Sequence, residues 1–180
     1  MAFININAKA KLMKLDVVEL NVSPDLLSKD ENYLINISIN NEKIPLKDYS
    51  IKNFEKNSLV SIKLPFQYPF GKKVYLEFEK IGNINIDLSN ALYFKEFDEM
   101  FNFDGELGSF YKKNVTTFRV WAPIAEDVYL WYQIDDVKYR ILPMERKEKG
   151  VYEIKIKKDL LNHGYRYFIN NYGHTSLVLD

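Results

Sequence analysis

The chain has 180 residues, of which 47% are hydrophobic and 28% are charged, which are ordinary values for a globular protein of one domain or two small ones. Its 25 basic and 25 acidic residues cancel, so no excess of positive charge is available to meet a nucleic-acid backbone. The sequence contains no cysteine, which excludes disulfides, thiolate metal sites and cysteine catalysis.

The amino-terminal half contains four runs in which apolar and polar residues alternate, a pattern that predicts strands with one buried and one exposed face. These runs cover residues 33–39, 60–64, 74–79 and 84–88. Between the last two runs, Ile81-Gly82-Asn83 is expected to close a hairpin. Residues 23–27 and 97–101 predict one short helical turn each, because Ser23 and Pro24 suit the start of a helix and neither segment is long.

The carboxyl-terminal half contains a second group of strands. The sequence predicts them at residues 116–121, 128–133, 138–142, 151–157, 165–169 and 175–179. Many short strands at about ten-residue spacing are typical of β-sandwiches rather than of an α/β fold. We therefore expect an all-β chain of two antiparallel sandwich domains in tandem, residues 1–95 and 96–180, with an error of about ten residues at the boundary.

Catalytic candidates are few. Three carboxylate pairs are adjacent in sequence, Asp30-Glu31, Asp98-Glu99 and Asp135-Asp136, but adjacent residues of a strand point to opposite faces and those of a turn are solvated. His163 and His174 are expected in solvated turns, and two histidines alone do not make a zinc site. Ser109 lies near glycines without the strand–turn–helix context of a nucleophile. We expect no catalytic residue, no metal and no cofactor.

Two motifs in the second half point to a known family. The first is Phe103-Asp104-Gly105-Glu106-Leu107-Gly108, and the second is the strand from Thr116 to Pro123, which reads TTFRVWAP. Three further segments follow in order: Asp127 to Leu130, Pro143-Met144 with Lys149 to Tyr152, and Gly164 to Tyr167. This ordered set resembles carbohydrate-binding module family 48, an immunoglobulin-like sandwich, as found in front of the catalytic barrel of type I pullulanases in glycoside hydrolase family 13.

The resemblance covers residues 97–180, and residues 1–95 match only the position of an additional amino-terminal domain. It implies two immunoglobulin-like sandwiches that precede a barrel hydrolysing α-1,6 linkages in starch, glycogen or pullulan. Such hydrolysis needs two carboxyl groups about 5 Å apart, carried by a barrel of about 250 residues. The chain is too short for that barrel, so the resemblance assigns the chemistry to a parent polypeptide and not to these residues.

Binding of α-glucan is the function that remains for the chain itself. Glucans stack on exposed aromatic rings, and Tyr129 and Trp131 share the strand face opposite Val128 and Leu130. Glycogen-binding members of the family use tryptophans, a lysine and an asparagine, and Arg166 resembles that lysine by strand alignment. The site residues expected on these grounds are Trp131, Tyr129, Tyr139, Arg166, Asn170 and Tyr172.

Three hypotheses stay open at this point. The chain is an accessory region of a debranching enzyme that packs against its barrel and contributes to glucan binding, or it is a stand-alone glycogen- or starch-targeting module, or it is a structural sandwich with no role in sugar binding. A branching enzyme is the second choice of parent.

The expected partners are an α-glucan and the barrel of the same polypeptide, with no nucleic acid. A membrane partner is not expected either, because no apolar run reaches the length of a span. The chain's start, Met1 to Asn5, lacks the pattern of a secretory signal, so a cytoplasmic location is expected.

Overall fold

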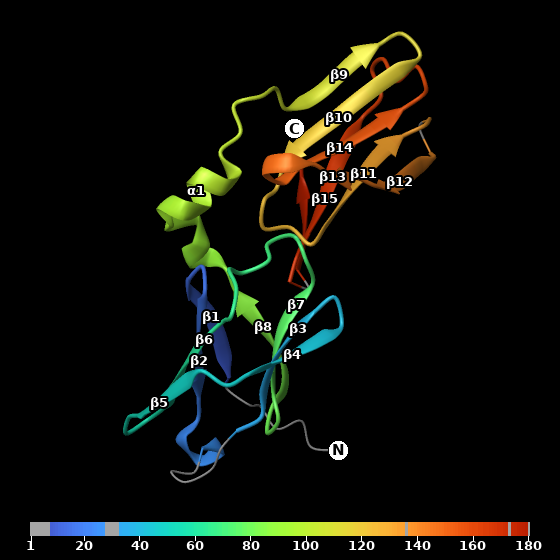
Figure 1. The fold of residues 1–180 in the computed structure, drawn as a ribbon. Helices are drawn as coiled ribbons and strands as arrows, with labels where there is room; N and C mark the ends of the chain where they lie inside the picture. Colours follow the sequence, from blue (N-terminus) through green and yellow to red (C-terminus); the bar gives the residue numbers. More distant parts are fainter. Residues whose placement is uncertain (1–7, 28–32, 136, 173, 180) are drawn as a thin grey trace. The chain divides into compact units, whose positions relative to one another are not determined.

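The computed structural model describes residues 8–27, 33–135, 137–172 and 174–179. The chain divides into two compact units, Met1–Asp98 and Glu99–Asp180 (Figure 1). The division lies within α1 (Lys95–Phe101), the one α-helix of the described residues, and the expected boundary at residues 95 and 96 lies at the start of this helix.

One eight-stranded sheet forms the first unit, in the order β4-β3-β7-β8-β1-β2-β6-β5. The strands are β1 (Lys9–Lys14), β2 (Val17–Val22), β3 (Ile35–Ile39), β4 (Glu42–Leu46), β5 (Tyr49–Asn53), β6 (Ser58–Lys63), β7 (Val74–Phe78) and β8 (Gly82–Asp87). Neighbouring strands are antiparallel except β1 and β8, which run parallel where Ala10 meets Ile86 and Lys11 meets Asp87. The expectation of purely antiparallel pairing is therefore wrong at this one junction, which joins two antiparallel halves.

The alternation of apolar residues positions the core of this unit. On β7, Val74, Leu76 and Phe78 are fully buried while the residues between them are half-exposed. Strands β2, β6 and β8 likewise bury alternate residues, and β3 buries Ile35 and Ile37 together with the polar Ser38. Each half of the sheet thus presents one apolar face, and burial of such faces is the main favourable term in folding.

Short helical segments connect and close the strands. They are η1 (Pro24–Leu26), η2 (Ser89–Tyr93) and α1, and residues 24–26 and 97–101 were both predicted to be helical. In α1, Phe97 is buried with its ring centroid 5.1 Å from that of Phe70. No helix among the described residues has the length and apolar character needed to cross a membrane.

Two four-stranded antiparallel sheets form the second unit, in the orders β13-β14-β10-β9 and β12-β11-β15-β16. The first contains β9 (Gly108–Lys112), β10 (Val115–Trp121), β13 (Glu145–Arg146) and β14 (Val151–Ile156). The second contains β11 (Asp127–Gln133), β12 (Tyr139–Pro143), β15 (Tyr165–Asn171) and β16 (His174–Val178). A short 3-10 segment, η3 (Glu148–Gly150), leads into β14.

The core of the second unit lies between these sheets. Phe118 from β10, Leu130 and Tyr132 from β11 and Tyr167 from β15 are all buried in one cluster, and Val120 packs against it. Phe118 contacts Tyr165 edge-on, with ring centroids 4.8 Å apart. The expectation that alternate residues of these strands face a common interior is confirmed, and the second unit is a two-layer sandwich.

Several strands were not predicted from the sequence. Strand β2 could have been predicted from its alternating pattern, since Val18, Leu20 and Val22 are apolar at every second position and are buried. Strand β5 lacks such a pattern, because it is an edge strand whose residues are all exposed or half-exposed. Strand β4 contains Pro45, which a sheet tolerates here because β4 is also an edge strand.

Candidate functional site

The outer face of the sheet β12-β11-β15-β16 carries most of the residues predicted for binding. On β11, Val128, Leu130 and Tyr132 are buried, so the residues between them point away from the core. The strand register places Trp131 between Ile141 of β12 and Arg166 of β15. Tyr129 is paired with Phe168 by the same register, and Asp127 with Asn170. The face is therefore rich in aromatic and amphipathic side chains.

An aromatic and cationic cluster lies at the centre of this face. The rings of Trp131 and Tyr139 are stacked, with centroids 5.6 Å apart and planes inclined by 28°. The Arg166 guanidinium carbon lies 5.3 Å from the centroid of the Trp131 ring, within the range of a cation–π contact. Tyr139 is 58% exposed and Trp131 is half-buried. Trp131 thus stacks with an exposed Tyr139 ring, and Arg166 beside Trp131 supplies hydrogen-bond donors.

A shallow groove of about 280 Å³ lies beside this cluster on the same face. Tyr129 and Phe168 line it together with Ile141, Asn170 and Thr175. Its volume is below the roughly 300–1,000 Å³ typical of enclosed small-molecule sites. An open, ring-lined surface of this kind suits an extended chain laid across the sheet better than a compact ligand.

The structure brings five of the six predicted binding residues to one face: Tyr129, Trp131, Tyr139, Arg166 and Asn170. Tyr172 does not join them. It lies after the end of β15 with a backbone φ of 51°, its side chain is buried, and its hydroxyl donates a hydrogen bond of 3.1 Å to the carbonyl oxygen of Ile124. Its ring offers no surface for stacking, so including Tyr172 in the binding site was wrong.

Three further residues of this face were not predicted: Ile141, Phe168 and Thr175. The signal for Phe168 was present in the sequence, because it lies between Arg166 and Asn170 at two-residue spacing and must share their side of β15. Ile141 and Thr175 come from the neighbouring strands β12 and β16, and their positions depend on a strand register that alternation alone does not fix.

The residues considered as catalytic candidates do not assemble into a site. Asp135 accepts hydrogen bonds from the backbone N–H groups of Val137 and Lys138, which is a turn-stabilising role. The Nδ1 atom of His163 lies 2.8 Å from the carbonyl oxygen of Gln133. His174 begins β16 rather than lying in a turn, because the strand extends back to it. Asp30, Glu31 and Asp136 lie outside the described residues.

In the described part of the chain, no three His, Cys, Asp or Glu side chains are close enough together to hold a metal ion.

The motif residues of the second unit have structural roles. The Trp121 indole N–H is shared between the carbonyl oxygens of Phe101, at 2.9 Å, and Lys149, at 3.0 Å. Arg146 donates hydrogen bonds to the carbonyl oxygen of Pro123 and to the hydroxyl of Tyr152. Burial raises the pKa of the Tyr152 hydroxyl, which itself donates to a buried carbonyl oxygen. These contacts fix the loops at one end of the sandwich.

Comparison with known proteins agrees with this arrangement. Residues 106–180 match the model of carbohydrate-binding module 48, described as the isoamylase N-terminal domain. A pullulanase of Bacillus subtilis is 42% identical over 71 residues, which are 39% of this chain and 10% of that protein. The chain therefore spans about a tenth of the curated relative it matches.

Solved structures extend the likeness to both units. A pullulanase of Anoxybacillus sp. LM18-11, complexed with maltotriose, matches 97% of this chain with a TM-score of 0.85 at 21% identity. The type I pullulanase of Bacillus subtilis, complexed with maltose, matches 100% of this chain with a TM-score of 0.85 at 22% identity. In each case the match covers 25% of the solved chain. Residues 106–180 are thus similar to carbohydrate-binding module 48, and the whole chain has the fold of the corresponding quarter of these pullulanases.

Proposed function

We propose that this chain is the non-catalytic amino-terminal region of a pullulanase-like enzyme that hydrolyses α-1,6 linkages in starch, glycogen or pullulan. The 42% identity to a pullulanase over 71 residues supports the choice of parent. The described residues form two β-rich units without the alternating strands and helices of a (β/α)₈ barrel. The 180-residue chain should therefore release no reducing ends from pullulan.

The chain's own contribution is binding of α-glucan at the outer face of β12-β11-β15-β16. The observation that carries this proposal is the exposed stack of Tyr139 on Trp131 with Arg166 beside it. A pyranose ring presents an apolar face of C–H groups that packs on an aromatic ring, while its hydroxyl groups need donors and acceptors. Arg166 supplies donors, and the Asn170 amide at the adjacent groove supplies both kinds of group.

Calorimetric titration of the 180-residue chain with maltohexaose tests this binding. Tyr139→Ala removes the exposed ring and should weaken binding by at least about tenfold, or about 1.4 kcal/mol. Tyr93→Ala is the matched control, because Tyr93 is 87% exposed and lies in the first unit. Equal affinities of the two variants, or no heat with the unsubstituted chain, would show that this face does not bind glucan.

A second partner is the barrel of the same polypeptide. We propose that it covers part of β16, whose five residues are all exposed and which forms an edge of its sheet. Leu177 and Leu179 are 50% and 70% exposed, and apolar edges of this kind are usually covered or paired. Amide hydrogen exchange in β16 should be fast in the 180-residue chain and slow in a polypeptide that includes the barrel. Equal exchange rates would contradict this packing.

We also propose that the protein is cytoplasmic and acts on stored glucan. Fractionation of the producing cell, followed by detection of the protein with an antibody, tests this location.

A further inference from the structure

A second groove lies on the other sheet of the second unit, away from the face described above. It has a volume of about 630 Å³, within the range of pockets that hold small ligands. Seven residues line it: Phe103, Arg119, Arg146, Lys147, Glu148, Val151 and Glu153. They come from three separate segments, namely the connection after α1, the strand β10, and the stretch from β13 to β14.

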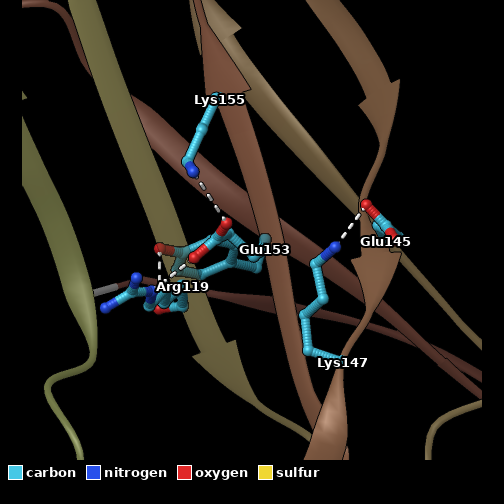
Figure 2. Close-up of polar contacts among 6 residues, drawn as sticks. Arg119, Glu145, Lys147, Glu153 and Lys155 are labelled. Carbon is cyan, nitrogen blue, oxygen red and sulfur yellow. Dashed lines mark hydrogen bonds and ion pairs between the residues drawn. The ribbon is translucent and has the colours of Figure 1, made fainter.

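An ion-paired network lies along the outer face of this sheet. The Arg119 Nε group donates to the Glu153 carboxylate at 2.6 Å, and Lys155 lies 3.6 Å from the other oxygen of that carboxylate (Figure 2). Figure 2 also shows Lys147 reaching Glu145, with which it forms an ion pair. The hydrogen bond from Arg119 holds the pKa of the Glu153 carboxyl below its usual range. The Glu153 carboxylate therefore stays charged at neutral pH.

The groove carries charges of both signs, and this restricts the ligand. Three cationic and two anionic side chains line it, and Lys147 and Glu153 are also paired with Glu145 and Lys155 beside it. An anionic ligand would meet the carboxylates and a cationic one would meet the guanidinium groups. A neutral ligand with many hydroxyl groups avoids both penalties, because each hydroxyl both donates and accepts hydrogen bonds.

Unused hydrogen-bonding groups are available in the groove. The Nη groups of Arg119 have no hydrogen-bond partner among the described residues, since only Nε bonds to Glu153. The Glu148 carboxylate forms no ion pair or hydrogen bond within the described part of the chain and is exposed. The groove thus offers donors from Arg119 and acceptors from Glu148.

An apolar wall completes the groove. Phe103 is held against the backbone of Gly105, where even a Cβ atom would lie 2.4 Å from its ring. Val151 is buried and lines the same groove. The Phe103 ring is half-exposed, so it can receive the C–H face of a sugar.

We propose that this groove is a second carbohydrate site, which binds a short neutral oligosaccharide between Phe103 and the Arg119–Glu153 pair. The assignment of the sugar as α-glucan rests on the proposed function. The two sites lie on the outer faces of the two sheets of one sandwich, so one domain would contact glucan through both faces.

Amide NMR spectra of the isotopically labelled 180-residue chain, titrated with maltotriose to about 10 mM, test this site at the millimolar affinities expected of short sugars. Two sets of signals should shift with different saturation curves. One set belongs to the face of Trp131 and Tyr139, and the other to Gly105 and residues 148–153. Phe103→Ala should weaken the second site by about tenfold and Glu148→Ala by about threefold. Tyr139→Ala should affect the first site alone.

Glu148→Ala guards against a folding artefact, because this side chain is exposed and forms no ion pair or hydrogen bond among the described residues. If only the Trp131 face responds to maltotriose, the second site is refuted and the proposed function stands. If neither set shifts, both proposals fail. If Tyr139→Ala abolishes both sets of shifts together, the signals of the second groove only report binding at the first site, and the groove is not a separate site.

Discussion

Gly150 offers a sharp test of how the second unit is held together. Its backbone φ is 72°, a left-handed conformation that L-residues adopt at a cost. A Cβ atom at this position would lie 2.5 Å from the Cα atom and 2.7 Å from the Cβ atom of Pro123. The Gly150 carbonyl also accepts a 3.0 Å hydrogen bond from the backbone N–H of Ala122. Gly150→Ala must therefore displace backbone that is already fixed by pairing.

The cost of Gly150→Ala can be estimated from two terms. The left-handed conformation costs about 1–2 kcal/mol for a residue with a Cβ atom, and relief of the overlap with Pro123 costs about 1–3 kcal/mol. The sum is about 3 kcal/mol, against a total stability of about 5–15 kcal/mol for a typical domain. With a urea dependence of about 1 kcal/mol per molar for a small domain, the unfolding midpoint should fall by about 3 M.

Urea unfolding followed by tryptophan fluorescence measures this cost in the second unit alone, because both tryptophans of the chain, Trp121 and Trp131, lie there. Gly164→Ala is the matched control. A Cβ atom at Gly164 would meet only the end of the Gln133 side chain, at 3.3 Å, and its φ is not left-handed. The control should change stability by less than about 1 kcal/mol. Equal midpoints for the two variants would refute the account of this loop.

Two further substitutions test the buried and the ion-paired groups of the same unit. Tyr152→Phe removes a 2.8 Å hydrogen bond to the carbonyl oxygen of Ala125 and should lower the free energy of unfolding by about 1–2 kcal/mol in urea titrations. Because the Tyr152 pKa is raised by burial, the wild-type hydroxyl stabilises the fold below the pKa of an unfolded tyrosine and loses this contribution as pH rises through the folded pKa. Glu153→Gln should cost about 1 kcal/mol at neutral pH. The Glu153 pKa is lowered by Arg119, so this cost should shrink as pH falls through the folded pKa, and a cost independent of pH would contradict the ion pair.

Sequence patterns predicted the sandwich of the second unit well, because its inner strands bury alternate residues. Val128, Leu130 and Tyr132 of β11 are all buried, and that single observation places Tyr129 and Trp131 on the outer face. Five of the six predicted binding residues share this face for the same reason. Tyr172 failed because it lies just beyond β15 in a left-handed turn, where alternation no longer says which way a side chain points.

Long-range features could not be predicted in the same way. The parallel contact of β1 with β8 joins segments more than seventy residues apart in sequence, and no local pattern specifies it. The second groove likewise depends on Phe103, Arg119 and Glu148, which lie on three separate segments. Only the register of β10 with β14, which pairs Arg119 with Glu153, brings the charged residues together.

The central claim is that α-glucan lies on the face that carries Trp131. The variant Trp121→Phe leaves Trp131 as the only tryptophan, so its emission reports on this face alone once unfolding measurements show that the variant is folded. Titration with maltohexaose should shift that emission along a saturable curve, while a disaccharide without glucose should leave it unchanged. An emission spectrum that maltohexaose does not alter, at concentrations up to about 10 mM, would contradict the assignment of this face as the glucan site.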